Sequence, residues 1–285
     1  AVAFGCSIAG LATPSGGARN VIAIGFLQQY GLHIDYLDWV VLAAPITLAL
    51  MPLLFVTLIL ANQLRNRSLD YHLPPAEPLR DRQLLALGIL GGTFLLFLTS
   101  GRTGLTLGTV AMLGAIAMHV SGVLEWDDSR RRLRWGVMFI YGAALTLGAA
   151  MVDHGVAEWL ALGIFGLVEG GGELLLFSVI ILLGVALTNI MSDGAAAAVL
   201  VPITLAVGVA AELDLAVVAI LTAISTAFAF MTAFGTPPNL IVHASGIPSS
   251  ADFVRNGVPM VLLAVLVLLV AQRYYWPIAL GWTGL

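Results

Sequence analysis

The sequence predicts an all-α polytopic membrane protein. Of its 285 residues, 60% are hydrophobic and only 10% are charged, and the mean hydropathy is +1.00. A soluble domain of this size carries about 25% charged residues. Several uncharged apolar stretches reach or approach the roughly 20 residues that a helix needs to cross a bilayer. The bilayer, rather than water, is therefore the expected solvent of this chain.

Charge, cysteine content and motifs exclude several classes of protein. The net charge is −4 and no basic stripe with interleaved aromatic residues is present, so no nucleic-acid partner is predicted. Cys6 stands alone, which excludes an intrachain disulfide and a thiolate metal site. No nucleophile elbow, phosphate-binding loop, zinc-type His-Glu-x-x-His or dinucleotide fingerprint occurs, so neither an enzyme nor a cofactor is predicted. The chain begins with Ala inside an apolar run, and we expect a fragment whose upstream part is absent rather than a signal peptide.

The arginines predict the topology, because all twelve basic residues are Arg and most lie in two clusters. One cluster falls in the linker 63–82 and the other in EWDDSRRRLRW, and short basic loops stay cytoplasmic. Apolar spans near 83–100 and 103–122, joined by SGRTG, return the chain to the same side. Both clusters can therefore be cytoplasmic. A last span, 257–276, ends in Arg-Tyr-Tyr-Trp, which we interpret as an interfacial anchor.

A hairpin is predicted over residues 173–211. Two apolar arms, 174–187 and 195–211, flank the polar tip TNIMSDG. Each arm is short for a full crossing at 1.5 Å per residue, which favours a re-entrant hairpin with its tip inside the bilayer. Irregular backbone at that depth needs protein or a water-filled cavity around it. An ordinary loop between two short helices is the alternative.

A broken helix is predicted over residues 215–246, where FGTPPNLIV interrupts an apolar stretch. Thr236 suits a helix cap and Pro237 suits the first helical position. The N–H groups at the start of such a half-helix bind anions, and the unwound carbonyls beside it bind cations. A tight loop outside the membrane is the alternative.

The stretch LATPSGGARNVIAIGF near the start repeats the pattern of this break. The alignment pairs Thr13 with Thr232, Gly16 with Gly235, and Asn20 with Asn239. By the topology above the first copy runs outward and the second inward, so we expect an inverted repeat, with residues 1–62 ending its first half and 83–285 forming its second. Asn20 and Asn239 are expected to hold backbone groups that the breaks leave free.

These residues resemble a known family. LTNIMSDGAAAAVLVPI followed by TAFGTPPNLIVHASG is similar to the second half of the divalent anion/sodium symporters, the carriers of dicarboxylates, citrate and sulfate, and SIAGLATPSGGARNVIAIGF resembles their first broken helix. The resemblance implies an elevator-type carrier of the cytoplasmic membrane, usually a homodimer. It also implies sodium ions near each hairpin tip and broken helix, and a missing inner hairpin.

The resemblance also implies site residues. The cation site at the hairpin would use Thr188, Met191, Asp193 and Gly235, and Gly16 would face the other sodium. The substrate would contact Ser192, Asp193, Gly194, Thr236 and Pro237.

Two departures from the family pattern put the usual dicarboxylate preference in doubt. The tip reads Ser-Asp-Gly instead of Ser-Asn-Thr, and Gly-Ala-Arg-Asn replaces Thr-x-Pro-Asn after the first break. Both departures place an ionisable group inside the bilayer, where it needs a partner or a function. If the two breaks meet, Arg19 would hold a carboxylate or sulfate by two hydrogen bonds and Asp193 would serve sodium or a proton. The alternatives are that Asp193 only caps a helix and that Arg19 reaches an interface.

Three function classes remain open. The first is sodium-coupled symport of a small anion. The second is a cation/proton antiporter or metalloid-efflux permease of the same broad fold, which an intramembrane acid favours. The third is a membrane protein without transport, such as an intramembrane enzyme, and the paired broken helices argue against it.

Overall fold

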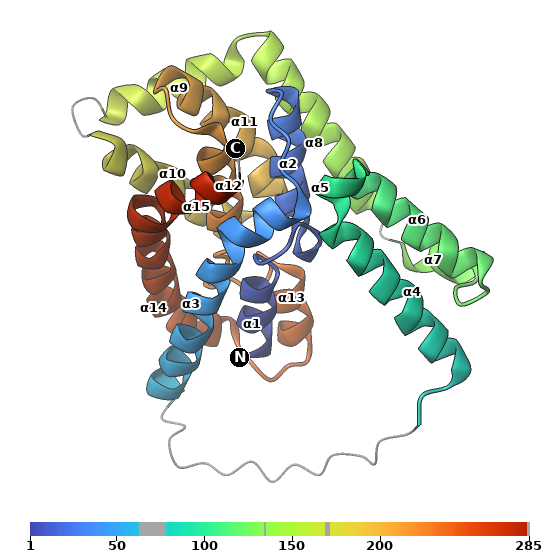
Figure 1. The fold of residues 1–285 in the computed structure, drawn as a ribbon. Helices are drawn as coiled ribbons and strands as arrows, with labels where there is room; N and C mark the ends of the chain where they lie inside the picture. Colours follow the sequence, from blue (N-terminus) through green and yellow to red (C-terminus); the bar gives the residue numbers. More distant parts are fainter. Residues whose placement is uncertain (63–77, 134, 169–171, 284–285) are drawn as a thin grey trace. The chain divides into compact units, whose positions relative to one another are not determined.

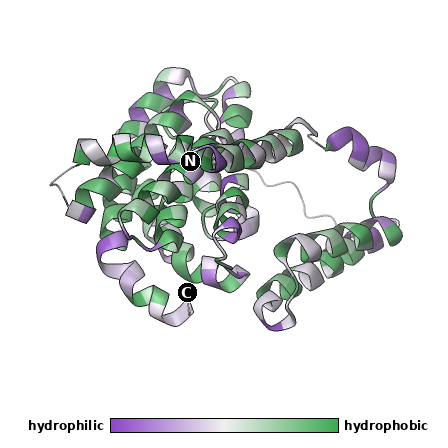
Figure 2. Cartoon of the chain, turned by 90° about the horizontal axis from the view of Figure 1, so that it is seen from above, coloured by the Kyte–Doolittle hydropathy of each residue, from purple (hydrophilic) through white to green (hydrophobic). Residues whose placement is uncertain are grey.

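The computed structural model describes residues 1–62, 78–133, 135–168 and 172–283 (Figure 1). Within these ranges the regular structure is helical throughout, which confirms the predicted all-α class. Most of the helices are coloured mainly green, the colour of hydrophobic residues, in Figure 2. Part of the first arginine cluster, at 63–77, and Arg134 of the second lie outside the described residues.

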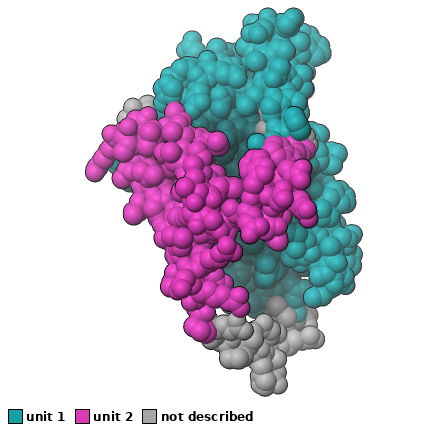
Figure 3. All heavy atoms as spheres, turned by 90° about the vertical axis from the view of Figure 1, so that its right-hand side faces the viewer, with its two compact units in different colours: residues 1–34, 38–65, 138–285 teal, residues 35–37, 66–137 magenta. Residues whose placement is uncertain are grey.

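The chain forms two compact units (Figure 3). Unit 1 comprises 1–34, 38–65 and 138–285, and unit 2 comprises 35–37 and 66–137. Unit 2 holds α4 (Asp81–Leu98), α5 (Ser100–Thr103), α6 (Leu107–Val120) and α7 (Trp126–Arg132). The predicted spans near 83–100 and 103–122 correspond to α4 and α6, which pack on each other.

Unit 1 contains every residue for which a site was predicted. Its helical elements are α1 (Val2–Ala9), η1 (Pro14–Gly16), α2 (Ala18–Gln29), α3 (Tyr36–Asn62), α8 (Trp135–Asp153), α9 (Val156–Val168), α10 (Gly172–Ile190), α11 (Asp193–Ala210), α12 (Leu215–Ser225), α13 (Pro237–Ala244), α14 (Ser250–Val270), η3 (Ala271–Tyr275) and α15 (Trp276–Thr283). Helix α11 packs against α2, α9 and α12, and α1 packs against α13 (Figure 1). The two segments that contain breaks therefore both lie in one unit with the hairpin.

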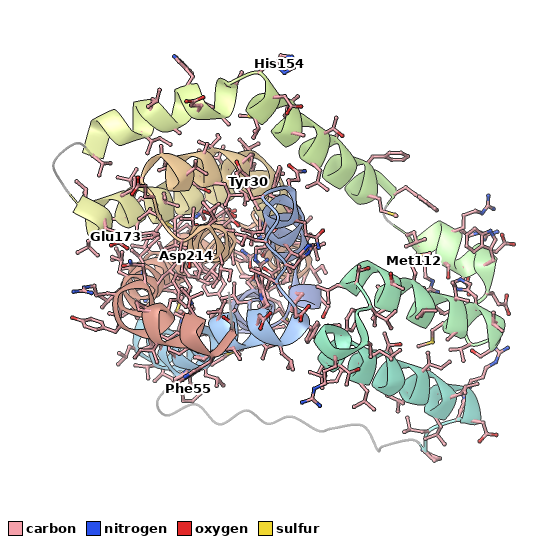
Figure 4. The ribbon with its side chains drawn as sticks, turned by 45° about the horizontal axis from the view of Figure 1, so that its top comes forward. Tyr30, Phe55, Met112, His154, Glu173 and Asp214 are labelled. Atoms are coloured by element: carbon pink, nitrogen blue, oxygen red, sulfur yellow. The ribbon has the colours of Figure 1, made fainter. Side chains whose placement is uncertain are left out.

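Five helical stretches among the described residues are long and apolar enough to cross a membrane: α3, α4, α10, α11 and the run from α14 to α15. Large apolar side chains on their outer faces suit contact with lipid. Phe55 on α3 is 67% exposed and points away from the neighbouring helices (Figure 4). His154, at the turn between α8 and α9, is exposed too and carries its ring outward. These features fit a multi-pass membrane protein.

The predicted hairpin arms were too short. α10 has 19 residues and α11 has 18, so each is about 27–29 Å long, and only two residues separate them. The first helix continues through Thr188 to Ile190. Within it, the side-chain amide of Asn189 donates to the carbonyl of Val185, one turn earlier. Ser192 then caps α11 by accepting the amide of Ala195. Helix length therefore does not separate a re-entrant hairpin from two crossings here, and the re-entrant hairpin stays a prediction.

The predicted interfacial anchor at the end of the last span was wrong for Trp276. The helix does not stop there but passes through the π-helical turn η3 into α15. Trp276 is 1% exposed, and its indole donates to the carbonyl of Leu42 in α3. The neighbouring Tyr275 hydroxyl donates to the carbonyl of Val41, the one that Pro45 leaves without a helical donor. The Tyr275 hydroxyl thus supplies the donor that Pro45 removes from α3.

Candidate functional site

The two chain breaks of unit 1 are held by the same kind of asparagine clamp. Between α1 and α2, Asn20 Nδ2 donates to the carbonyls of Gly10 and Thr13, both at 2.8 Å. Between α12 and α13, Asn239 Nδ2 donates to the carbonyls of Ala229 at 2.6 Å and Thr232 at 2.9 Å. In both breaks the acceptors lie ten and seven residues before the asparagine. Each clamp supplies donors to carbonyls at the interruption of the helix, and the Thr13 carbonyl also accepts the amide of Gly16.

A glycine permits close backbone approach in each break. A Cβ on Gly16 would lie 2.6 Å from the Gly10 carbonyl oxygen. A Cβ on Gly235 would lie 2.5 Å from the Cβ of Ala229 and 2.8 Å from the carbonyl oxygen of Thr188. Real Cβ atoms do not make such contacts, so both positions require glycine. The pairs Gly10/Gly16 and Ala229/Gly235 again correspond at one offset.

The start of α13 follows the sequence prediction. Thr236 is the N-cap, and its hydroxyl accepts the amide of Asn239 at 3.4 Å, while Pro237 occupies the first helical position. The start of α2 has Gly17 in the same place and no side-chain cap. The two half-helices thus begin differently although their clamps match.

The hairpin tip is tied to the second break by four hydrogen bonds. The Asp193 amide donates to the carbonyl of Gly235 at 2.9 Å, and the Thr188 hydroxyl donates to the carbonyl of Thr226 at 2.5 Å. Asn189 donates to the carbonyl of Phe228 and accepts the amide of Met231. These bonds satisfy backbone groups of the unwound stretch 226–236, which is buried from 226 to 230 and partly exposed after that.

A buried ion pair joins the first break to the hairpin tip. Arg19 Nη1 lies 2.5 Å from Asp193 Oδ2, and the two side chains are 4% and 14% exposed. Arg19 Nη2 donates to the carbonyl of Ser7 in α1 at 3.2 Å. The guanidinium lies against Gly17, whose Cβ, if present, would be 2.9 Å from Nη1. The alternative in which Arg19 reaches an interface is therefore wrong, because its partner lies inside unit 1.

Helix dipoles make this pair electrically asymmetric. Asp193 is the first residue of α11, where a negative charge is favourable, and its Oδ1 accepts the amide of Gly194. Arg19 is the second residue of α2, where a positive charge is unfavourable. The N-termini of α2 and α11 and the guanidinium therefore attract negative charge, and among the described residues Asp193 is the carboxylate that pairs with Arg19.

Several buried polar atoms around the breaks have no hydrogen-bond partner. They are Arg19 Nε, the side-chain oxygens of Asn20 and Asn239, and the hydroxyl of Thr232. The asparagine nitrogens must be the donors to the two carbonyls in each clamp, so it is the oxygens that remain free. Buried polar atoms without partners are rare and costly. Three neutral oxygens and one cationic N–H at the two breaks are therefore available to hydrogen-bond or coordinate a ligand.

The family model described as the sodium:sulfate symporter transmembrane region matches residues 1–282. The chain belongs to this family. A transporter of Haemophilus influenzae with no assigned substrate is 27% identical over 96% of this chain and 62% of its own length. The sodium-dependent dicarboxylate transporter SdcS of Staphylococcus saprophyticus is 27% identical over 99% of this chain and 59% of its own length, and SdcS of Staphylococcus aureus is 25% identical with the same coverage.

Membership of the sodium:sulfate symporter family settles the broad class. The family and these relatives are transporters, not enzymes, and the protein is a multi-pass integral membrane protein. The chain spans about three fifths of the length of the curated relatives it matches.

In this family member the predicted site residues fall into two groups. Arg19, Asp193, Gly235 and Thr236 are linked by hydrogen bonds, directly or through Ser7. The other predicted residues differ in their surroundings. Thr188, Asn20 and Asn239 are buried and hydrogen-bonded within the breaks, and Gly194 is buried and donates its amide to Asp193 Oδ1. Met191 is half-buried, and the exposed residues are Gly16, Ser192 and Pro237.

Sequence reasoning missed Ser7. Its hydroxyl lies 3.2 Å from that of Thr236, and its carbonyl accepts Arg19, so Ser7 connects the starts of α2 and α13. The available signal was a hydroxyl side chain within an otherwise apolar eight-residue helix. Sequence reasoning also missed Asn189, whose side chain lies in the hairpin and bonds two backbone groups of the second break. Its place in the polar tip was the available signal.

Proposed function

We propose that this protein is a secondary active transporter that carries a small divalent anion, of the dicarboxylate, citrate or sulfate class, together with sodium across the cytoplasmic membrane. The relatives named as sodium-dependent dicarboxylate transporters support this class. The observation that carries the proposal for this chain is the buried Arg19 guanidinium at the hairpin tip, with an unpartnered Nε–H.

The anion is proposed to bind the Nε–Nη2 edge of Arg19. That edge presents two parallel N–H groups, and carboxylates and sulfate accept such a pair in a planar, bidentate geometry. Nη2 makes only one contact, at 3.2 Å, and Nε makes none among the described residues. The N-termini of α2 and α11 add favourable potential, and Ser192, Gly194, Thr236 and Pro237 are the further proposed contacts.

The coupling cation is proposed to bind oxygen atoms beside the two breaks. Sodium in transporters is held by unwound carbonyls and by oxygens at half-helix ends. At the second break these would be the oxygens of Thr188, Thr232, Gly235 and Asn239, with Asp193 as the charged ligand and Met191 flanking them. At the first break the Asn20 oxygen and the backbone at Gly16 take the corresponding places. Among the described residues no cluster of three His, Cys, Asp or Glu side chains occurs, which fits sodium better than a transition metal.

The architecture belongs to the same proposal. The equal offsets of the two asparagine clamps support an inverted repeat with two broken helices. On that basis we propose elevator-type transport by a homodimer, with residues 1–62 ending the first repeat and 83–285 forming the second.

A cation/proton antiporter or metalloid-efflux permease is the second candidate. The observation in its favour is Asp193, a largely buried acid at the hairpin tip. Such a protein needs the acid to exchange cations and has no use for a guanidinium that binds an anion. Loss of function on changing Asp193 alone, with Arg19 dispensable, would favour this candidate.

Proteoliposomes of the full-length protein test the proposal. We expect uptake of radiolabelled succinate, citrate or sulfate under a sodium gradient and none when choline replaces sodium. Arg19→Ala should abolish binding and uptake of the anion, and Asp193→Asn should loosen the dependence on sodium. Arg273→Ala, in an exposed position, is the matched control and should transport normally. Uptake that ignores sodium, or that survives Arg19→Ala, contradicts the proposal.

A further inference from the structure

We infer that Arg19 is a tethered cation that competes with sodium for Asp193. The guanidinium contacts the Asp193 carboxylate in the structure, and in this proposal a sodium ion binds there only when Arg19 leaves. This inference rests on the proposed role of Asp193 as a cation ligand. It adds the reason why cation and anion would bind together.

The two oxygens of Asp193 have separate tasks. Oδ1 accepts the amide of Gly194 within the first turn of α11, and Oδ2 faces Arg19 Nη1. The Asp193 amide is in turn held by the carbonyl of Gly235. The carboxylate is therefore fixed by its backbone and its cap, and the partner of Oδ2 can change without disturbing either.

Oxygens of the kind that binds sodium lie around Gly235. The Cβ position of Gly235 is 2.8 Å from the carbonyl oxygen of Thr188 and 3.1 Å from the hydroxyl of Thr232. That hydroxyl is buried and unpartnered. The carbonyl of Gly235 accepts the backbone amide of Asp193, so these neutral oxygens belong to the segment that is bonded to the hairpin tip, and in this proposal they complete the oxygen ligands that a hard cation at Asp193 requires.

The guanidinium itself is incompletely satisfied. Of its five N–H donors, one faces Asp193 and one faces the Ser7 carbonyl, while Nε–H has no partner. Its planar group lies beside Gly10 and Gly17, which have no side chains to lock it in place. An anion at the Nε–Nη2 edge would compete with Asp193 for the positive charge of the guanidinium and favour a position of Arg19 away from the carboxylate, which would then need another cation. An anion without sodium would leave Asp193 unpaired, which is strongly unfavourable.

Sodium binding in the absence of any transported anion tests the inference. We would follow the thermal unfolding of purified full-length protein while sodium gluconate replaces choline gluconate at constant ionic strength. In Arg19→Gln the carboxylate loses its tethered cation, so the sodium concentration for half-maximal stabilisation should fall at least about fivefold below that of the wild type. The double variant Arg19→Gln/Asp193→Asn should lose this gain, and Arg273→Gln should match the wild type.

The double variant also distinguishes a change in sodium binding from a folding defect of Arg19→Gln. If Arg19→Gln is unstable because Asp193 is left unpaired, sodium should restore its stability, whereas the double variant should be stable in choline. A shift smaller than fivefold in Arg19→Gln, or an equal shift in the double variant, overturns the inference. No transported anion is present, so the result stands apart from the uptake assay of the proposed function.

Discussion

The two breaks of unit 1 share their supports and differ in the residues that follow. In both, an asparagine amide bonds carbonyls ten and seven residues earlier, and a glycine lets the backbone fold closely on itself. After the second break come Thr-Pro-Pro, with a hydroxyl cap at Thr236. After the first come Gly-Ala-Arg, with no cap and a buried charge.

This difference distinguishes the residues that support the backbone from those that form the candidate site. The shared residues solve a problem that any interrupted helix has in an apolar medium, namely backbone groups without partners. The residues that differ decide what the break presents to the centre of unit 1. At the start of α13 that is the neutral hydroxyl of Thr236, and at the start of α2 it is the guanidinium of Arg19, which bonds Asp193.

The largest expected effect concerns the shared clamps. Asn239→Ala removes the side-chain donor from two carbonyls, and Asn20→Ala removes it from the Gly10 carbonyl, whereas the Thr13 carbonyl keeps the amide of Gly16 as a donor. At about 1–3 kcal/mol for each group, we expect losses of about 2–6 kcal/mol for Asn239→Ala and about 1–3 kcal/mol for Asn20→Ala, measured by thermal unfolding of the full-length protein. Asn62→Ala is the control, because that exposed amide sits at the end of α3 and should matter much less. If only one clamp variant is destabilised, the two breaks are not held alike.

A smaller effect is expected at the paired glycines. In Gly16→Ala and Gly235→Ala the new Cβ meets backbone or a short side chain that cannot move away, so we expect losses of about 1–3 kcal/mol. Gly142→Ala, in α8, has open space around it and should be neutral or slightly stabilising. The same unfolding assay serves for all three. Wild-type stability in either paired variant would show that its break relaxes easily.

The smallest expected loss of stability sharpens the difference between the breaks. Gly17→Ala places a Cβ 2.9 Å from Arg19 Nη1, and the guanidinium can shift because it is the end of a long side chain. We expect little change in unfolding temperature but about tenfold weaker anion binding, equal to about 1.4 kcal/mol. Equilibrium binding of succinate or sulfate in saturating sodium measures this. The double variant Gly17→Ala/Arg19→Ala should bind no worse than Arg19→Ala alone, and an additional loss there would mean that Gly17 acts independently of Arg19.

Much of the fold could be predicted from the sequence because its signals are local. Apolar runs predict the helices, and the Thr-Pro pair before Asn239 predicts both the cap and the start of α13. The lengths of α10 and α11 could not be predicted, because polar residues at a tip can remain helical when their side chains find distant backbone partners, as Asn189 does.

The candidate site was predictable only where its signals are local. Charge inside an apolar chain drew attention to Arg19 and Asp193, but their direct contact spans 174 positions and leaves no local trace. The link through Ser7 depends on which face of α1 meets α13, which the uniformly apolar pattern of α1 does not specify.

The kink of α3 has a consequence for the order in which this protein matures. Pro45 leaves the carbonyl of Val41 without its helical donor, and the hydroxyl that completes it belongs to Tyr275, 234 positions later in the chain. At about 5–20 residues per second, a ribosome needs about 10–50 s to supply that residue. Throughout this interval α3 carries an open polar group that only water, lipid headgroups or the insertion machinery can cover. The hydrogen bond between Tyr275 and Val41 can therefore form only after nearly all of the described chain has been synthesised.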